Sequence, residues 1–155
     1  RGQPARAGGR RTGVKMRTMA VIVAGLALPV TACGDGTAPG GAAGSLKGRS
    51  FLSTSVTEDG KPRQLVTKTR IRLQFTDDGR LLADAGCNSM QAPVSTGDGR
   101  LELEDLAVTE MGCDAPRHAQ DRWLAGVLSS KPAWRLESDR LTITAANAIL
   151  VLHSS

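Results

Sequence analysis

The chain has 155 residues and a formal net charge of +5, from 20 basic and 15 acidic side chains. The 32 residues before Cys33 contain six basic residues and no acidic one, whereas the remainder has 14 basic and 15 acidic residues. The excess positive charge therefore lies in this leader, and net charge gives no argument for nucleic-acid binding by the rest. The 123 residues from Cys33 onward suffice for one domain with a modest core.

Residues 1–32 have the pattern of an export signal. Met16 is the better initiator and Met19 the second choice, and either start leads into the apolar run 19–30. A basic start, an apolar stretch of roughly 7–15 residues and small residues before a cleavage point are typical of a secretory signal. The run has 12 residues, whereas a spanning helix needs about 20. We therefore expect an export tag and no spanning helix here.

The signal ends in Val30, Thr31, Ala32 and Cys33, a pattern that resembles the lipobox of bacterial lipoproteins. In that class the chain is cut before the cysteine, which then carries fatty acyl chains such as palmitate. Each buried methylene contributes about 0.8 kcal/mol, so two or more chains hold a protein on a membrane. We expect a lipid anchor at Cys33 on the extracytoplasmic face of the cell membrane. The alternative is an ordinary signal peptide with a chance cysteine.

The other cysteines are Cys87 and Cys113, which are 26 positions apart. If Cys33 is lipidated, they remain as a pair in an oxidising compartment, where disulfides persist. A bridge between them would stabilise the fold by about 3 kcal/mol through restriction of the unfolded chain. The alternative is two free buried thiols.

Residues 33–46 are rich in Gly and Ala, which predicts a flexible tether before a domain at 47–155. Within the domain, alternating apolar and polar residues predict strands with one buried face. Asn147 is expected in the left-handed region, where it would turn the chain into the last strand. The expected strands are 50–57, 71–75, 80–85, 100–104, 133–137, 140–144 and 149–152, with turns at 77–79 and 97–99.

One segment, 114–130, has helical spacing instead. Asp114 can cap its first turn, and Pro116 fits there sterically. The sequence therefore predicts a mainly β (α+β) fold, an antiparallel, partly closed, barrel-like sheet with one packed helix. The apolar residues expected on the buried face of the helix are Ala119, Trp123, Leu124, Val127 and Leu128.

Two motifs and a strand point to a known family. Gly86, Cys87 and Asn88 follow an alternating strand, and a Thr-x-Met-x-Cys pattern precedes the helix. With the Leu-Thr-Ile strand at 141–143, this order resembles the META domain, the HslJ-like family of bacterial envelope proteins, over roughly residues 47–153. The resemblance implies a β fold and an envelope location, with association to stress, drug-resistance and motility phenotypes and no established reaction. The motif residues, which we interpret as structural, are Gly86, Cys87, Asn88, Thr109, Met111 and Cys113.

The motif loops have a simple physical interpretation. Gly86 permits a positive φ at a strand end, and Asn88 can bond its own backbone. Asp121 stands where a Glu is frequent in the family, and Phe51 stands where a Trp is common.

Candidates for chemistry are few. Ser89 and His118 with Asp114 or Asp121 could form a nucleophile–base set, but no Gly-x-Ser-x-Gly elbow is present, and we expect a solvated surface histidine. Cys113, Asp114 and His118 are close in sequence, yet no CxxC or HExxH spacing supports a metal. We expect no catalytic residue, no metal and no cofactor.

Two charged clusters are expected to be solvated. A carboxylate pair for glycoside hydrolysis needs aromatic residues nearby that stack on the sugar. Such residues are not expected beside Glu102, Glu104 and Asp105, because Trp123 and Trp134 are expected in the core. A set of basic residues could meet anionic lipid or cell-wall polymer, or could be a charged edge that discourages aggregation. These basic residues are Lys61, Arg63, Lys68, Arg70 and Arg72.

The sequence thus predicts a membrane-anchored, non-enzymatic binding or assembly module of the cell envelope with a stress-related role. Its working surface would be a sheet edge or an apolar groove that binds an envelope protein. One alternative is a carrier of lipid or another apolar ligand inside the barrel. Another is a small exported hydrolase or redox protein using Ser89 and His118, or Cys87 and Cys113.

Overall fold

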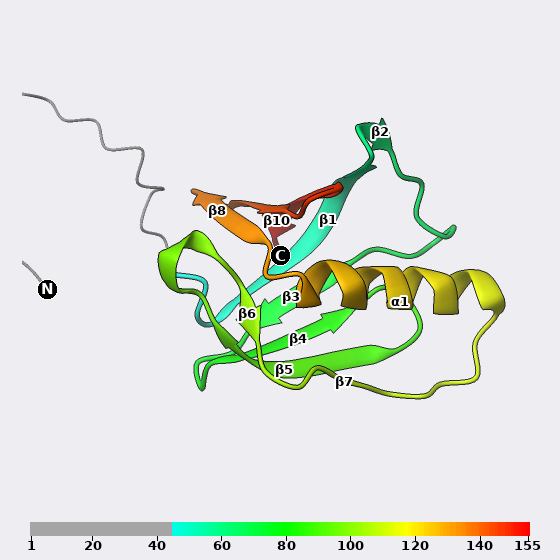
Figure 1. Ribbon diagram of the computed structural model, residues 1–155, viewed down its shortest axis with the longest axis horizontal. Helices are drawn as coiled ribbons and strands as arrows, with labels where there is room; N and C mark the ends of the chain where they lie inside the picture. Colours follow the sequence, from blue (N-terminus) through cyan, green and yellow to red (C-terminus); the bar gives the residue numbers. More distant parts are fainter. Residues whose placement is uncertain (1–44) are drawn as a thin grey trace, which may run out of the picture. The chain divides into compact units, whose positions relative to one another are not determined.

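The computed structural model describes residues 45–155, which form a curled antiparallel sheet and one helix (Figure 1). The predicted export signal, Cys33 and the tether up to residue 44 lie outside the described residues. In the described part of the chain, no helix is long and apolar enough to cross a membrane. The strands are β1 (Arg49–Glu58), β2 (Lys61–Pro62), β3 (Arg72–Phe75), β4 (Arg80–Asp84), β5 (Ser89–Ser95), β6 (Glu102–Leu103), β7 (Ala107–Val108), β8 (Ala133–Glu137), β9 (Arg140–Thr144) and β10 (Ala148–Ser154).

The strands follow the order β6-β5-β4-β3-β1-β10-β9-β8, with β2 added to β1 and β7 added to β5. The two ends of this sheet approach each other. Arg100, just before β6, forms a bridge with Ala133 in β8, and the Leu101 N–H donates to the Pro132 carbonyl at 2.9 Å. The sheet is therefore a partly closed barrel, as the sequence predicts.

The core lies inside this curled sheet and under the helix α1 (Ala115–Ser129). Ile71, Leu73 and Phe75 are buried on one face, as their alternation predicts. Leu46, which the sequence analysis places in the tether, is also buried in the core. The largest fully buried side chains are Phe51, Ile71, Leu73, Leu81, Met90, Leu101, Leu124, Leu128, Leu136, Leu141, Ile143 and Leu150.

The helix begins as predicted, because the Asp114 carboxylate accepts the Arg117 N–H at 3.0 Å and Pro116 lies in the first turn. Its buried face differs from the prediction. Ala119 is exposed, whereas the polar residues Gln120 and Asp121 are buried. A face chosen by hydrophobicity alone misses these two positions, since their burial depends on hydrogen bonds to distant loops.

Three other expectations need correction. The strand expected at 100–104 is reduced to β6, because Arg100 and Leu101 turn to meet the β8 end of the sheet. Asn147 does not adopt the expected positive φ, so the turn into β10 does not use the left-handed region at this residue. The two tryptophans are half-buried at the rim rather than fully in the core.

Each tryptophan keeps a hydrogen bond at the rim, which explains its position. The Trp123 indole N–H donates to Glu58 Oε1 at 2.7 Å, and the Trp134 indole N–H donates to the Thr96 carbonyl at 3.1 Å. An indole that is buried usually needs such a partner.

Candidate functional site

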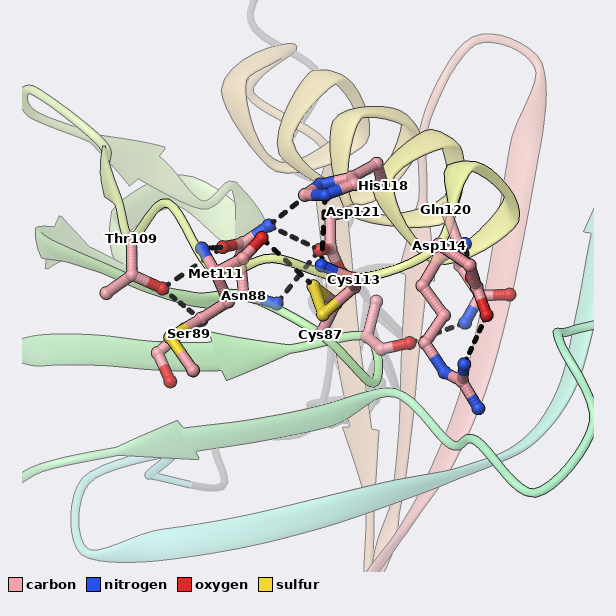
Figure 2. Close-up of a disulfide and its surroundings, with 12 residues drawn as sticks. Cys87, Asn88, Ser89, Thr109, Met111, Cys113, Asp114, His118, Gln120 and Asp121 are labelled. Carbon is pink, nitrogen blue, oxygen red and sulfur yellow. Dashed lines mark hydrogen bonds and ion pairs between the residues drawn. A yellow bond between two sulfur atoms is a disulfide. The ribbon is translucent and has the colours of Figure 1, made fainter.

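A buried polar cluster lies between the end of β4, the segment before α1 and the first turns of α1 (Figure 2). Asn88 is 4% exposed and Asp121 is 2% exposed. The backbone N–H and the side-chain amide of Asn88 donate to Asp121 Oδ2 at 2.9 and 2.8 Å. Asn88 Oδ1 accepts from the Met111 N–H at 2.8 Å and from the Thr109 hydroxyl at 3.3 Å.

Asn88 therefore joins three segments of the chain. The sequence predicts instead that Asn88 bonds its own backbone, and this prediction is wrong. Asn88 lies in the loop after β4, its side-chain oxygen accepts from the segment before α1, and its side-chain nitrogen donates to the helix. Thr109 and Met111 contribute one hydroxyl and one backbone N–H to this junction. These motif residues are thus part of a single hydrogen-bonded unit.

The disulfide expected between Cys87 and Cys113 is present beside this unit and ties the same two loops together. Gly86 precedes it with φ +109°, a conformation that favours glycine. A Cβ at this position would also collide with the Thr69 side chain. The loop after β4 therefore requires glycine for two independent reasons.

Gln120 extends the cluster to the long loop after β2. Its side-chain carbonyl accepts the Val66 N–H at 2.7 Å, and its amide donates to the Thr69 hydroxyl at 2.8 Å and to the Ala85 carbonyl. The side chain is 2% exposed. The first turns of α1 are therefore held by polar contacts to both neighbouring loops.

His118 is half-buried in the cluster and is not the solvated surface residue that the sequence predicts. Its Nε2 accepts the Cys113 N–H at 3.3 Å, and its Nδ1 lies 3.4 Å from the Asn88 side-chain nitrogen. Across residues 45–155 no hydrogen bond joins Ser89 to His118, and Asp114 instead caps the helix and pairs with Arg117. The structure does not assemble the nucleophile–base set considered from the sequence.

Cys87, His118 and Asp121 form a group that the sequence analysis missed. One sulfur, one ring nitrogen and one carboxylate oxygen of these residues lie within 4.8 Å of one another. Asp121 Oδ1 is buried and has no hydrogen-bond partner among residues 45–155. In the sequence, Asp114 is the carboxylate that adjoins Cys113, and Asp121 is considered only as a partner of Ser89 and His118.

A separate groove of about 360 Å³ lies on the outer face of β3, β4 and β5, beside β7. Its lining mixes apolar side chains, such as Leu82 and Val108, with hydrogen-bonding ones, such as Gln74 and Gln91. Val108 is 43% exposed, and Met111, farther along the same segment, is 56% exposed. This face therefore combines an apolar surface with polar groups.

Asp84 is the acidic group of the groove. Burial raises the pKa of its carboxyl, the nearby Arg72 guanidinium lowers it, and the charge of Asp121 raises it further. Arg72 Nε lies 3.8 Å from Asp84 Oδ2, which is a loose ion pair. The carboxylate is thus incompletely compensated within the domain.

The two charged clusters from the sequence do not form sites of one sign. Arg63 pairs with Glu58 and lies 4.3 Å from the centre of the Trp123 ring. Arg72 pairs with Asp84, whereas Lys61, Lys68 and Arg70 are exposed. Glu102 pairs with Lys131 at 3.3 Å, and Glu104 and Asp105 are exposed.

Comparisons with known proteins agree with this architecture. The model of the META domain matches residues 44–155. A protein from Burkholderia xenovorans, solved by NMR, is 16% identical with a TM-score of 0.61, over 71% of this chain and 83% of that chain. A second protein solved by NMR is 20% identical with a TM-score of 0.54, over 68% and 88% of the two chains. No curated protein matches significantly. At these identities the two structures support the fold alone.

Proposed function

Because the chain belongs to the META domain family, we propose that it is an exported, lipid-anchored and non-enzymatic binding module of the bacterial cell envelope. The lipobox pattern at residues 30–33 and the export signal before it support the anchor. The disulfide between Cys87 and Cys113 supports an oxidising compartment, and it leaves Cys33 as the remaining cysteine for the lipid. Family association also favours a stress-related role.

The groove beside β7 carries the proposal of a binding role. Its lining offers Leu82, Ala107 and Val108 to an apolar side chain, and Asp84 to a cationic one. Arg72 lies 3.8 Å from Asp84 and pairs with it only loosely, which leaves the carboxylate open to a partner's Lys or Arg. Burial raises the pKa of Asp84, and a basic residue of the partner would oppose this effect as Arg72 does. We infer that the occupant is an extended segment of an envelope protein with an apolar residue next to a basic one.

The packing of the domain weighs against the alternatives. A carrier of lipid needs space inside the barrel, but the described interior is filled by the side chains of the hydrophobic core. A hydrolase needs a nucleophile in contact with a base, and Ser89 bonds through its backbone to Thr109 instead. A redox enzyme usually needs an accessible low-pKa thiolate, whereas both candidate thiols are in the disulfide.

The anchor is tested by the mass and the location of the protein. The detergent-extracted chain should begin at Cys33 with added acyl mass, and Cys33→Ala should leave the membrane fraction. Cys87→Ser serves as the control, since it removes a cysteine without touching the lipobox and should stay membrane-bound. An unlipidated mass, or a membrane-bound Cys33→Ala protein, would refute the anchor.

The groove is tested by photo-cross-linking in intact cells. A photoreactive residue is placed at Val108 in the groove lining or at Ile149 in β10, which is almost equally exposed at 42% and lies outside the groove lining. We expect one discrete protein adduct from position 108 and none from position 149. Asp84→Asn should reduce the yield of the adduct formed from position 108. Equal labelling from both positions, or no adduct from position 108, would contradict the proposal that the groove is the binding surface.

A further inference from the structure

We propose that reduction of the disulfide converts the buried polar cluster into a zinc site with Cys87, Cys113, His118 and Asp121 as ligands. One ligand atom each of Cys87, His118 and Asp121 already lies within 4.8 Å of the other two. Cys113 joins this group because its sulfur is bonded to that of Cys87. Figure 2 shows the disulfide, His118 and Asp121 gathered at the start of α1.

Asp121 is the residue that most strongly indicates a cation. The residue is only 2% exposed, and in the described part of the chain its buried Oδ1 has no hydrogen-bond partner. Buried polar atoms of folded proteins are rarely left unpaired. The other oxygen, Oδ2, takes two N–H groups of Asn88. Such hydrogen bonds hold a carboxylate ligand in place for a metal, and they leave Oδ1 free to coordinate.

His118 supplies the second preformed ligand. Both ring nitrogens face nitrogen donors, Cys113 N at 3.3 Å and Asn88 Nδ2 at 3.4 Å. A neutral imidazole accepts through one nitrogen only, so these two long contacts cannot both be good hydrogen bonds. The weaker of the two leaves a ring nitrogen that a metal ion can take.

The donor set fits zinc. Two thiolates, one imidazole and one carboxylate are ligand types of tetrahedral zinc sites. Zinc distances of about 2.3 Å to sulfur and about 2.0 Å to nitrogen or oxygen place neighbouring ligand atoms about 3.3–3.8 Å apart. The present spacing of up to 4.8 Å therefore needs to contract by roughly 1 Å, which side-chain rotation supplies once the two sulfurs separate.

Reduction of the disulfide between Cys87 and Cys113 needs a dithiol reductant, such as a protein of the thioredoxin type. Its two thiols give two electrons and two protons, the sulfur–sulfur bond of the protein breaks, and the reductant becomes a disulfide. Zinc then displaces one proton from each of Cys87 and Cys113 as the thiolates bind. The oxidised protein lacks these thiolates and does not form the site. The zinc site needs neither the lipid anchor nor the groove, and in an oxidising compartment it forms only where such a reductant acts on the domain.

Cobalt and zinc titrations of the purified full chain test the site. The protein is reduced with a phosphine, which takes the oxygen of water while the two sulfurs take its protons. We expect the reduced chain to give the visible absorption of tetrahedral Co²⁺ with thiolate charge transfer, and Zn²⁺ to displace the cobalt. The oxidised chain should give neither signal.

Single substitutions separate this site from adventitious binding by two thiols. Asp121→Asn keeps an acceptor for Asn88 but loses the charged ligand, and His118→Gln loses the imidazole. Each should weaken zinc binding by at least about tenfold. The matched control is Asp114→Asn, which removes an exposed carboxylate near His118 while keeping a good helix cap, and its affinity should be unchanged.

Three results would overturn the proposal. The first is a reduced chain without the tetrahedral cobalt spectrum, and the second is equal zinc affinity in the wild type, Asp121→Asn and His118→Gln. The third concerns folding, because reduction or a substitution can unfold the domain. A reduced wild-type chain that loses its circular dichroism signal and does not regain it with Zn²⁺ has no such site.

Discussion

The second half of α1 buries Leu124, Val127 and Leu128, whereas the first half buries Gln120 and Asp121. The apolar half packs into the hydrophobic core of the sheet. The polar half is held by hydrogen bonds to two loops, the one after β2 and the one after β4. One helix therefore combines two ways of fixing an element in place.

The two halves differ in how specific their partners must be. Apolar packing depends on volume and tolerates exchange between similar side chains. A buried hydrogen-bonded unit depends on direction, and removal of one member leaves the others unsatisfied. This difference explains why the loops of the cluster need particular residues, Gly86 and Asn88, while the apolar half needs only suitable shapes.

The largest loss of stability is expected from the apolar half. Leu124→Ala removes a fully buried side chain of the core and should lower the free energy of unfolding by about 3–4 kcal/mol, within the range for such truncations. Urea unfolding measures it. Ile149→Ala, at an exposed position of β10, is the control and should change stability by less than about 0.5 kcal/mol. A small loss for Leu124→Ala would mean that the core relaxes around the cavity.

The fold was largely predictable because this apolar half and the strands follow simple periods. Alternation at Ile71, Leu73 and Phe75 predicts β3, and the spacing of Leu124 and Leu128 predicts α1. Asp114 marks the start of the helix through a local hydrogen bond. Hydrophobicity and local capping act over a few residues, and a sequence shows such short-range signals directly.

The polar cluster could not be predicted in the same way. Asn88 and Asp121 are 33 positions apart, and their contact depends on how the sheet curls. A buried Asp in a helix is indistinguishable in sequence from an exposed one, so hydrophobicity places Ala119 on the buried face instead. The resemblance to the META domain identified the motif residues, but their hydrogen-bond partners became known only from the structure.

The next largest loss of stability is expected from the polar half of α1. Asn88→Ala removes the acceptor of the Met111 N–H and one donor to Asp121. It should lower the free energy of unfolding by about 2–3 kcal/mol, because buried groups lose their hydrogen-bond partners. Hydrogen exchange should show faster opening of the first turns of α1 than of its apolar half. The measurement therefore separates the two halves of one helix.

Asn147→Ala is the matched control for that experiment, since Asn147 is exposed and gives the same chemical change. Its stability and exchange rates should stay close to those of the wild type. Uniform acceleration along α1 in Asn88→Ala would contradict the division of the helix into two halves. In that case, the helix would open as a single unit.

The smallest expected effect links the polar half to the groove, because the charge of Asp121 helps to raise the pKa of Asp84. Burial, the largest cause, raises this pKa above its ordinary value of 3.8, and the Arg72 charge opposes it. A carboxyl with a raised folded-state pKa stabilises the fold below pH 3.8, and this contribution is lost as the pH rises through the folded-state value.

Asp84→Asn should therefore leave the urea midpoint unchanged below pH 3.8 and raise it slightly at neutral pH. Glu110→Gln, at an exposed position, removes the same charge elsewhere and should show no such difference between the two pH values. A lower midpoint for Asp84→Asn at neutral pH would mean that attraction to Arg72 outweighs burial. The groove carboxylate would then be compensated within the domain, which would remove the reason for a basic residue in the bound segment.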